Sequence, residues 1–188
     1  MKKDIFILGC ARSGKTTLAN RISQYQYNII SVDSYVSAFK ENFPELNITH
    51  HNDYLSDKSK RLSYFIMSYY YKIKQEYPNQ KFVIEGWHIL PKDIVPLIGR
   101  KNCNIVCLGY PNAKEDEMFQ LIRENDQENS TTRNLEDAKL RELISSHIEY
   151  SKILKEQCLD LGIPFYETNK GREKILENII DFFKTEKN

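Results

Sequence analysis

The chain has 188 residues, of which 40% are hydrophobic and 28% are charged, and its formal net charge at pH 7 is +1. This length and apolar content fit residues 1–188 as a single domain with its own core. The small net charge argues against a bulk attraction to nucleic acid or to an anionic membrane, and no apolar run is long enough to span a bilayer.

The first expected element is an apolar strand at residues 5–8, which runs directly into a phosphate-binding motif. Residues 9–16 read G-x-x-x-x-G-K-T, and helical sequence follows at 15–24. In this context the loop N–H groups and the helix N-terminus bind phosphate, Lys15 supplies a cation for the β- and γ-phosphates, and the Thr16 hydroxyl is placed to ligate Mg²⁺. The predicted nucleotide-phosphate site comprises Gly9, Cys10, Ala11, Arg12, Ser13, Gly14, Lys15, Thr16 and Thr17.

Strand-like and helical segments alternate along the rest of the chain. We expect further strands at 28–32, 82–85, 105–108 and 164–167, and further helices at 57–75, 114–124, 135–161 and 174–183. This alternation predicts an α/β fold built from βαβ units around a parallel sheet that is buried on both faces. Two insertions stand out: a long connection at 34–81, and a polar segment at 123–134 that we expect to form a mobile loop.

Two carboxylates follow expected strands. Asp33 comes after the second strand and Glu85 ends the third, so both are aimed at the edge of the sheet that holds the phosphate motif. Asp33 there can accept a proton from a substrate hydroxyl or orient it, although Asp is also a favoured helix cap. Glu85 fits a position that binds Mg²⁺ through water or touches substrate, with a buried structural role as the alternative. Gly86 allows a close approach of backbone or ligand, and Trp87 either stacks on a substrate ring or walls the pocket.

The polar segment at 123–134 is bracketed by Arg123 and Arg133. Phosphoryl transfer needs cations around the transferred group and exclusion of water, and a mobile loop that carries arginines supplies both. Within the first insertion, His50, His51, Arg61 and Tyr64 are candidate substrate contacts. The tyrosine-rich stretch at 68–77 has helical spacing of apolar residues, so we interpret it as a core-facing helix, with nucleic-acid binding as the disfavoured alternative.

Cysteine spacing and the N-terminus bear on cellular context. The four cysteines form no C-x-x-C pair, and Cys103 and Cys107 fit small core residues. Met1, Lys2 and Lys3 lead straight into the first strand, so a cleavable leader would take the phosphate motif with it. We therefore expect a cytoplasmic protein, as a monomer or a homodimer.

These features together resemble the small P-loop kinases, a group that includes nucleoside monophosphate kinases, shikimate and gluconate kinases and chloramphenicol phosphotransferase. The resemblance is carried by the N-terminal phosphate loop, by Asp33 after the second strand, by the arginine-bearing lid and by the terminal strand and helix. It implies a five-stranded parallel sheet of order 2-3-1-4-5 and an adenine site between Arg123 and the loop that holds Thr168 and Asn169. Ser31 stands where shikimate kinases have the first Asp of D-x-D, which leaves Glu85 as the substitute at the metal site.

The sequence therefore predicts a kinase that uses ATP and Mg²⁺ to phosphorylate a hydroxyl or phosphate group of a small molecule, with catalytic roles for Lys15, Asp33, Arg123 and Arg133. The substrate contacts expected are Asp33, Arg61, Glu85, Gly86 and Trp87, and the metal contacts are Thr16 and Glu85. The alternatives are a nucleotide-regulated ATPase or binding module, and a nucleoside or nucleotide kinase of nucleic-acid metabolism. A switch GTPase is disfavoured because Arg172 occupies the position of the guanine-reading carboxylate.

Overall fold

The computed structural model describes residues 3–48, 57–98, 103–126 and 132–185. Five parallel strands form one sheet in the order β2-β3-β1-β4-β5, as the resemblance implied. The strands are β1 (Asp4–Gly9), β2 (Tyr27–Ser31), β3 (Lys81–Gly86), β4 (Cys103–Gly109) and β5 (Phe165–Glu167). The helices are α1 (Lys15–Ser23), α2 (Val32–Asn42), α3 (Asp57–Glu76), α4 (Pro91–Ile98), α5 (Glu115–Asn125), α6 (Asp137–Leu161) and α7 (Arg172–Thr185), with a 3-10 turn at Pro44–Leu46.

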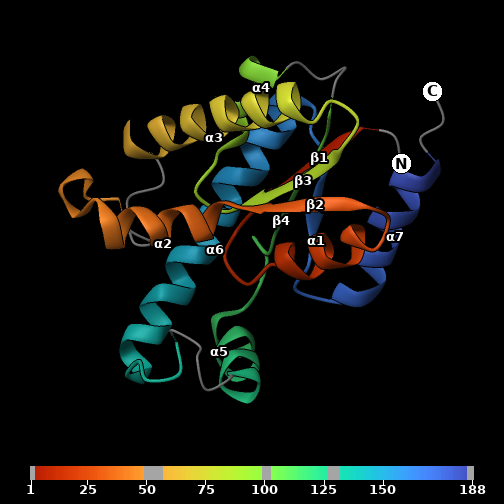
Figure 1. The fold of residues 1–188 in the computed structure, drawn as a ribbon. Coiled ribbons are helices and arrows are strands. Elements are labelled where there is room, and N and C mark those ends of the chain that lie inside the picture. The colour runs from red at the N-terminus through yellow and green to blue at the C-terminus, as the bar shows by residue number, and fades with distance from the viewer. Residues whose placement is uncertain (1–2, 49–56, 99–102, 127–131, 186–188) are drawn as a thin grey trace.

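Helices cover both faces of the sheet (Figure 1). On one face, α1 and α7 pack against alternate residues of β1, among them Ile5 and Ile7. On the other face, α2, α3, α4 and α6 pack against Phe6 and Leu8. Strand side chains alternate between the two faces, and both faces of β1 are buried, which explains its continuous apolar sequence. Every helix in the described ranges is too short or too polar to cross a membrane.

A buried carboxylate anchors the tyrosine-rich helix α3 to the sheet. Asp4 accepts hydrogen bonds from the Tyr70 hydroxyl at 2.7 Å and from the Phe82 N–H at 2.8 Å, and Lys74 lies 3.1 Å away. Ile66 and Tyr70 are buried and Tyr69 is half-buried against the core, so the prediction of a core-facing helix is confirmed. These contacts make Tyr69 and Tyr70 part of the packing between α3 and the sheet.

Three helical segments were not expected from the sequence. The 3-10 turn at Pro44–Leu46 and the helices α2 and α4 occupy stretches that the sequence left unassigned. The expected strand at 28–32 is shifted by one residue in the structure, because β2 spans Tyr27–Ser31 and α2 begins at Val32. Asp33 is therefore in the first turn of a helix and not at the end of a strand, although it remains at the carboxyl edge of the sheet.

Gly86 is required by the packing of β3 against the start of α2. A Cβ atom at this position would lie 2.5 Å from the Cβ of Val32, closer than two non-bonded carbon atoms can approach. The close approach expected from the sequence is therefore backbone against side chain, and it sets where α2, with Asp33, lies relative to β3.

We expect Gly86→Ala to lower the free energy of unfolding by about 1–3 kcal/mol, because the added methyl group must push α2 away from β3. Chemical denaturation measures this loss. The control is Gly171→Asn, because Gly171 has φ of 63° with open space around its Cα, and Asn tolerates this conformation. Equal stability of wild type and Gly86→Ala would contradict the packing argument.

Candidate active site

The phosphate loop connects β1 to α1 and has backbone conformations that few residues adopt. Gly9 and Gly14 have φ of 142° and 97°, and Arg12 has φ of 59°. At Gly9 a Cβ atom would lie 2.1 Å from the carbonyl oxygen of Leu108, so this glycine lets β1 lie close to β4. Gly14 is the N-cap residue of α1 and needs its left-handed conformation there. The loop thus turns sharply enough to place the N-terminus of α1 at the carboxyl edge of the sheet, where it favours an anion.

The centre of the loop is held by hydrogen bonds to Cys10. The Cys10 N–H donates to the carbonyl of Leu108 at 3.0 Å, so this amide is committed to β4. The Cys10 carbonyl accepts from the Ser13 hydroxyl at 2.8 Å and from Nζ of Lys15 at 2.6 Å. Burial raises the pKa of the Cys10 thiol, which donates to the carbonyl of His147 at 3.2 Å. Cys10 is therefore a packed structural thiol, and its carbonyl holds the ammonium group of Lys15 at the loop.

Glu85 is a buried carboxylate beside this cation. It shares with Val83 the face of β3 that α1 covers, and it pairs in register with Ile7. Its side chain is close enough to Lys15, Asp33, Ser31 and Thr16 to interact with each, and the residue is only 2% exposed. Within the described ranges its Oε2 atom is buried and makes no hydrogen bond. A buried carboxylate oxygen of this kind next to the Thr16 hydroxyl fits a divalent cation, since Mg²⁺ prefers oxygen ligands.

Asp33 and Trp87 form the opposite side of the site. Asp33 is in the first turn of α2 with its side chain 42% exposed, and its Oδ1 lies 3.9 Å from Nε2 of the buried His88. Trp87 follows β3, and the Tyr150 hydroxyl of α6 donates a 2.7 Å hydrogen bond to the Trp87 carbonyl. This bond ties the backbone just after β3 to α6.

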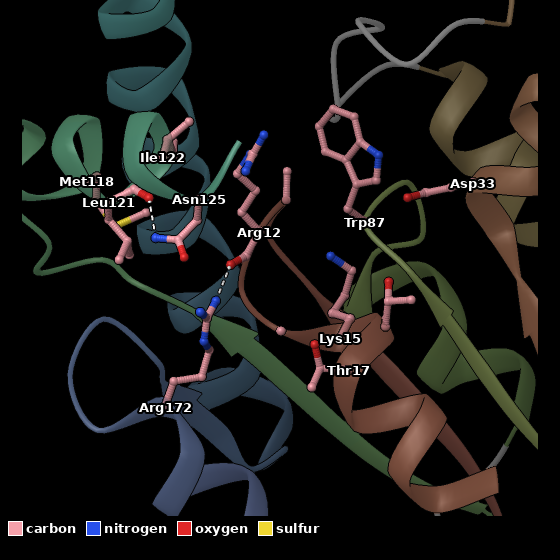
Figure 2. A pocket seen from close by; sticks show the side chains of 13 residues that line it. Arg12, Lys15, Thr17, Asp33, Trp87, Met118, Leu121, Ile122, Asn125 and Arg172 are labelled. Carbon is pink, nitrogen blue, oxygen red and sulfur yellow. Dashed lines mark hydrogen bonds between the residues drawn. The ribbon is translucent and has the colours of Figure 1, made fainter. Parts of the chain in front are cut away.

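One cavity of about 330 Å³ brings Lys15, Thr16, Asp33 and Trp87 together (Figure 2), and Glu85 is absent from its described lining. It is lined by the phosphate loop and α1, by Asp33 and Trp87, and by two regions that the sequence analysis did not assign to the site. The first region is the inner face of α5, and the second is the start of α7. The unassigned lining residues are Met118, Leu121, Ile122, Asn125 and Arg172.

A helical apolar stripe was the only signal for the α5 residues, and it does not distinguish a cavity wall from core. Arg172 was considered only as a departure from the guanine motif, and its Nη1 atom lies 3.5 Å from the carbonyl of Arg12. Both regions reach the site through tertiary packing, which the sequence pattern does not record.

Arg12 joins the phosphate loop to both ends of the expected lid. Its guanidinium is 2.6 Å from Oδ1 of Asp126, which is 4% exposed, and it also donates to the Thr132 hydroxyl. Thr132 donates to the same Asp126 oxygen at 2.7 Å. Residues 127–131 of the expected lid lie outside the described residues. Asp126 and Thr132 are therefore packed against the phosphate loop, whereas Glu124, Arg133 and Asn134 are exposed. The mobility expected of this segment stays a prediction.

Arg123 holds the segment that follows Thr132. Its guanidinium donates to the carbonyls of Thr132, Arg133 and Leu135 at 3.2, 3.1 and 2.6 Å, and lies 2.6 Å from the Asp137 carboxylate. Arg123 and Arg133 do not line the cavity among the described residues, and the Arg133 side chain is exposed. In this structure Arg123 therefore fixes the start of α6, and its expected contacts with adenine or phosphate stay a prediction.

The remaining predicted residues are absent from the described lining of the cavity. Thr168 is buried and its N–H donates to the carbonyl of Gly109 at 2.8 Å, which places Asn169 in the loop between β5 and α7. Arg61 is exposed on α3. His50 and His51 lie outside the described residues.

The fold is similar to solved structures of small-molecule kinases. A shikimate kinase from Bacteroides thetaiotaomicron is 17% identical with a TM-score of 0.61, over 97% of this chain and 98% of that chain. A shikimate kinase from Acinetobacter baumannii, solved with shikimate, is 16% identical with a TM-score of 0.56, over 98% and 94%. A gluconokinase from Sinorhizobium meliloti is 12% identical with a TM-score of 0.55, over 98% of both chains. No protein-family model and no curated protein sequence matches this chain.

At these identities the likeness establishes the fold, which is the α/β fold of the small P-loop kinases. It leaves the chemistry of this chain to be argued from its own side chains.

The buried Glu85 gives a stability prediction that depends on pH. Burial raises the pKa of Glu85, Lys15 opposes that rise and Asp33 adds to it. Because the folded-state pKa exceeds the unfolded one, ionising Glu85 costs stability as the pH rises through the folded-state pKa. We expect Glu85→Gln to melt higher than wild type at about pH 7.5 in metal-free buffer, with the gap closing toward about pH 4. Each kcal/mol moves the melting temperature of a domain of this size by about 2–4 °C.

Glu167 is the control with the opposite sign. Its hydrogen bond from Lys155, at 2.6 Å, holds the pKa of Glu167 below its ordinary value. We expect Glu167→Gln to melt lower than wild type near neutral pH, with the gap closing as the pH falls. A Glu85→Gln variant that behaves like Glu167→Gln would show that the Glu85 carboxylate is satisfied by partners within the protein.

Proposed function

We propose that this protein is an ATP-dependent phosphotransferase that transfers the γ-phosphoryl group to a hydroxyl of a small molecule. The observation that carries the proposal is the shared cavity, in which Lys15 and the α1 N-terminus lie on one side and Asp33 lies on the other. A phosphate site next to a carboxylate at the carboxyl edge of a parallel sheet is the arrangement that transfer to a hydroxyl requires.

The α5 face and Arg172 are the side of the cavity that we assign to the nucleotide. Met118, Leu121 and Ile122 offer apolar surface for a base, and Asn125 adds an amide that can hydrogen-bond to it. The phosphate chain would then run along the loop toward Lys15. Thr16 and Glu85 are the residues that would hold Mg²⁺, which when bound neutralises phosphate oxygens.

Asp33 is positioned to act on the acceptor. Its carboxylate accepts the hydroxyl proton or orients that hydroxyl, while the hydroxyl oxygen forms a bond to the γ-phosphorus. The bond between the γ-phosphorus and the β–γ bridging oxygen breaks, and ADP leaves with that oxygen and its electrons. Lys15 stabilises negative charge on the phosphate oxygens during this step, and the acceptor leaves as a phosphate ester.

We expect Lys15→Ala to reduce phosphoryl transfer by at least about 100-fold, because it removes the ammonium group that the phosphate motif supplies to the β- and γ-phosphates. The measurement is ADP release in the presence of the acceptor. Lys152→Ala, which removes an exposed lysine of α6, is the matched control and should retain wild-type turnover. Turnover by Lys15→Ala within a few-fold of wild type would refute the nucleotide site.

The variant Asp33→Asn separates the role of the Asp33 carboxylate, which acts on the acceptor hydroxyl, from that of the phosphate loop, which binds the nucleotide. The change keeps the shape of the side chain and removes its charge, so transfer to the acceptor should fall by about 100- to 10,000-fold, the range for a positioned base. Nucleotide affinity, measured by calorimetry, should stay within about threefold of wild type because the loop and Lys15 are untouched. The control is Asp116→Asn, an exposed carboxylate of α5 that pairs with Arg141. If Asp33→Asn instead loses nucleotide binding, Asp33 is a structural residue or a metal ligand and not the group that acts on the acceptor.

A further inference from the structure

The phosphate loop carries an arginine in a backbone conformation that favours glycine. Arg12 has φ of 59°, a left-handed conformation that is uncommon for residues other than glycine and costs backbone free energy. A glycine at this position would adopt the conformation without that strain. The contacts of the Arg12 side chain offset the strain, and its partners show which part of the molecule the arginine holds in place.

The side-chain partners of Arg12 lie at the end of α5 and just before α6. Its Nη2 atom is 2.6 Å from Oδ1 of Asp126 and also donates to the hydroxyl of Thr132, which donates to the same Asp126 oxygen at 2.7 Å. We call these three residues the α5 brace. The side chain of Asp126 is 4% exposed, so removing the guanidinium would leave a charge in the interior without this cation. The brace is therefore harder to break than an ion pair on the surface.

The α5 brace holds the end of α5 that lines the cavity. Asp126 is the C-cap of α5 and directly follows Asn125, and both Asn125 and Ile122, one turn earlier, are part of the cavity lining. Figure 1 shows α5 away from the sheet, beside the first turns of α6. The other end of α5 is bound to α6 by Arg141, which pairs with Glu115. The brace thus connects the cavity-lining end of α5 to the phosphate loop.

The backbone of Arg12 is bound from the other side, by the start of α7. Its carbonyl accepts a hydrogen bond from Nη1 of Arg172 at 3.5 Å. The Arg172 side chain also packs against the loop at Gly14, where a Cβ atom would lie 3.2 Å from the Arg172 Cδ. Figure 2 shows this bond, with the Arg12 side chain turned away from Arg172. One residue of the loop therefore contacts both regions that we assign to the nucleotide.

We propose that Arg12 and Asp126 are positioning residues for the nucleoside part of ATP, and that the α5 brace sets the affinity for that part and not for the phosphate chain. This inference rests on the proposed function, which assigns the α5 face to the nucleotide. The phosphates bind to the loop N–H groups, to the α1 N-terminus and to Lys15, whereas the base packs on side chains whose place depends on α5. Transfer of the guanidinium from Asp126 to a phosphate is disfavoured, because it would take the cation away from a buried carboxylate.

Two ligands separate these two parts of the nucleotide. Tripolyphosphate has the phosphate chain of ATP without the nucleoside, and calorimetry with Mg²⁺ measures the affinity of the whole chain for each ligand, with displacement of ATP for the weaker one. We expect wild type to bind ATP more tightly than tripolyphosphate. In Arg12→Gly and in Asp126→Ala, the affinity for ATP should fall about tenfold or more, while the affinity for tripolyphosphate should stay within about threefold of wild type.

The variants are chosen so that backbone and charge effects can be told apart. Glycine suits φ of 59° at position 12, and the double variant Arg12→Gly/Asp126→Ala removes both charges, so that neither is left without its partner. Because both single variants break the same contact, the double variant should lose about as much affinity for ATP as either one. The controls are Gln26→Gly, an exposed residue with φ of 66°, and Asp181→Ala, which removes an exposed ion pair of α7. Both controls should bind ATP like wild type.

An equal loss of affinity for ATP and tripolyphosphate would overturn this inference and leave the proposed function intact. A loss in Arg12→Gly with wild-type binding in Asp126→Ala would also overturn it, because the guanidinium would then act on the phosphates directly. Wild-type affinity for ATP in all three brace variants would show that the brace does not position the nucleotide. Failure of the wild-type protein to bind ATP at all would count against the proposed function itself.

Discussion

A buried lysine and a buried glutamate beside the carboxyl edge of the sheet are the constraint on which the site depends. Lys15 and Glu85 are 5% and 2% exposed, and moving both charges out of water costs several kcal/mol that their attraction only partly offsets. Two apolar residues of similar size would pack there at less cost. The pair is held by the sheet itself, because β1 carries the loop that leads to Lys15 and the register with β3 places Glu85 opposite Ile7. Opposite charges in the interior at this point support the ligands proposed above, a nucleotide phosphate at Lys15 and a divalent cation at Glu85.

Residues next to Glu85 and Lys15 also position the helices around the sheet. Gly86 follows Glu85 directly and lets Val32 approach β3, so the residue that ends the strand also positions the helix that carries Asp33. On the other side, Arg12 turns out of the loop to Asp126 and Thr132 and ties α5 and the start of α6 to the phosphate site. The two walls of the cavity are thus both attached to the phosphate loop, one through β3 and one through Arg12.

Much of this could be predicted from local sequence, and the part that could not has a physical reason. The phosphate motif, the five strands and the placement of Asp33 and Glu85 at one edge follow from patterns within a few residues. The α5 wall and Arg172 meet the loop only through contacts between segments more than 100 residues apart. The helix α2 was missed because its start follows β2 without a turn, so a strand-like sequence runs straight into it. Arg123 carries no local sign of whether its guanidinium binds a ligand or, as here, the backbone just before α6.

The central claim is that a phosphoryl group passes from ATP to a small-molecule hydroxyl beside Asp33. Phosphorus NMR of the protein with ATP, Mg²⁺ and hydroxylated small molecules tests it most directly, because it shows where the phosphate goes. The account predicts a new phosphate monoester signal that grows as ATP is converted to ADP, and that is lost in Asp33→Asn. Inorganic phosphate as the only new signal, at the same rate with and without every acceptor, would contradict the account and identify an ATPase.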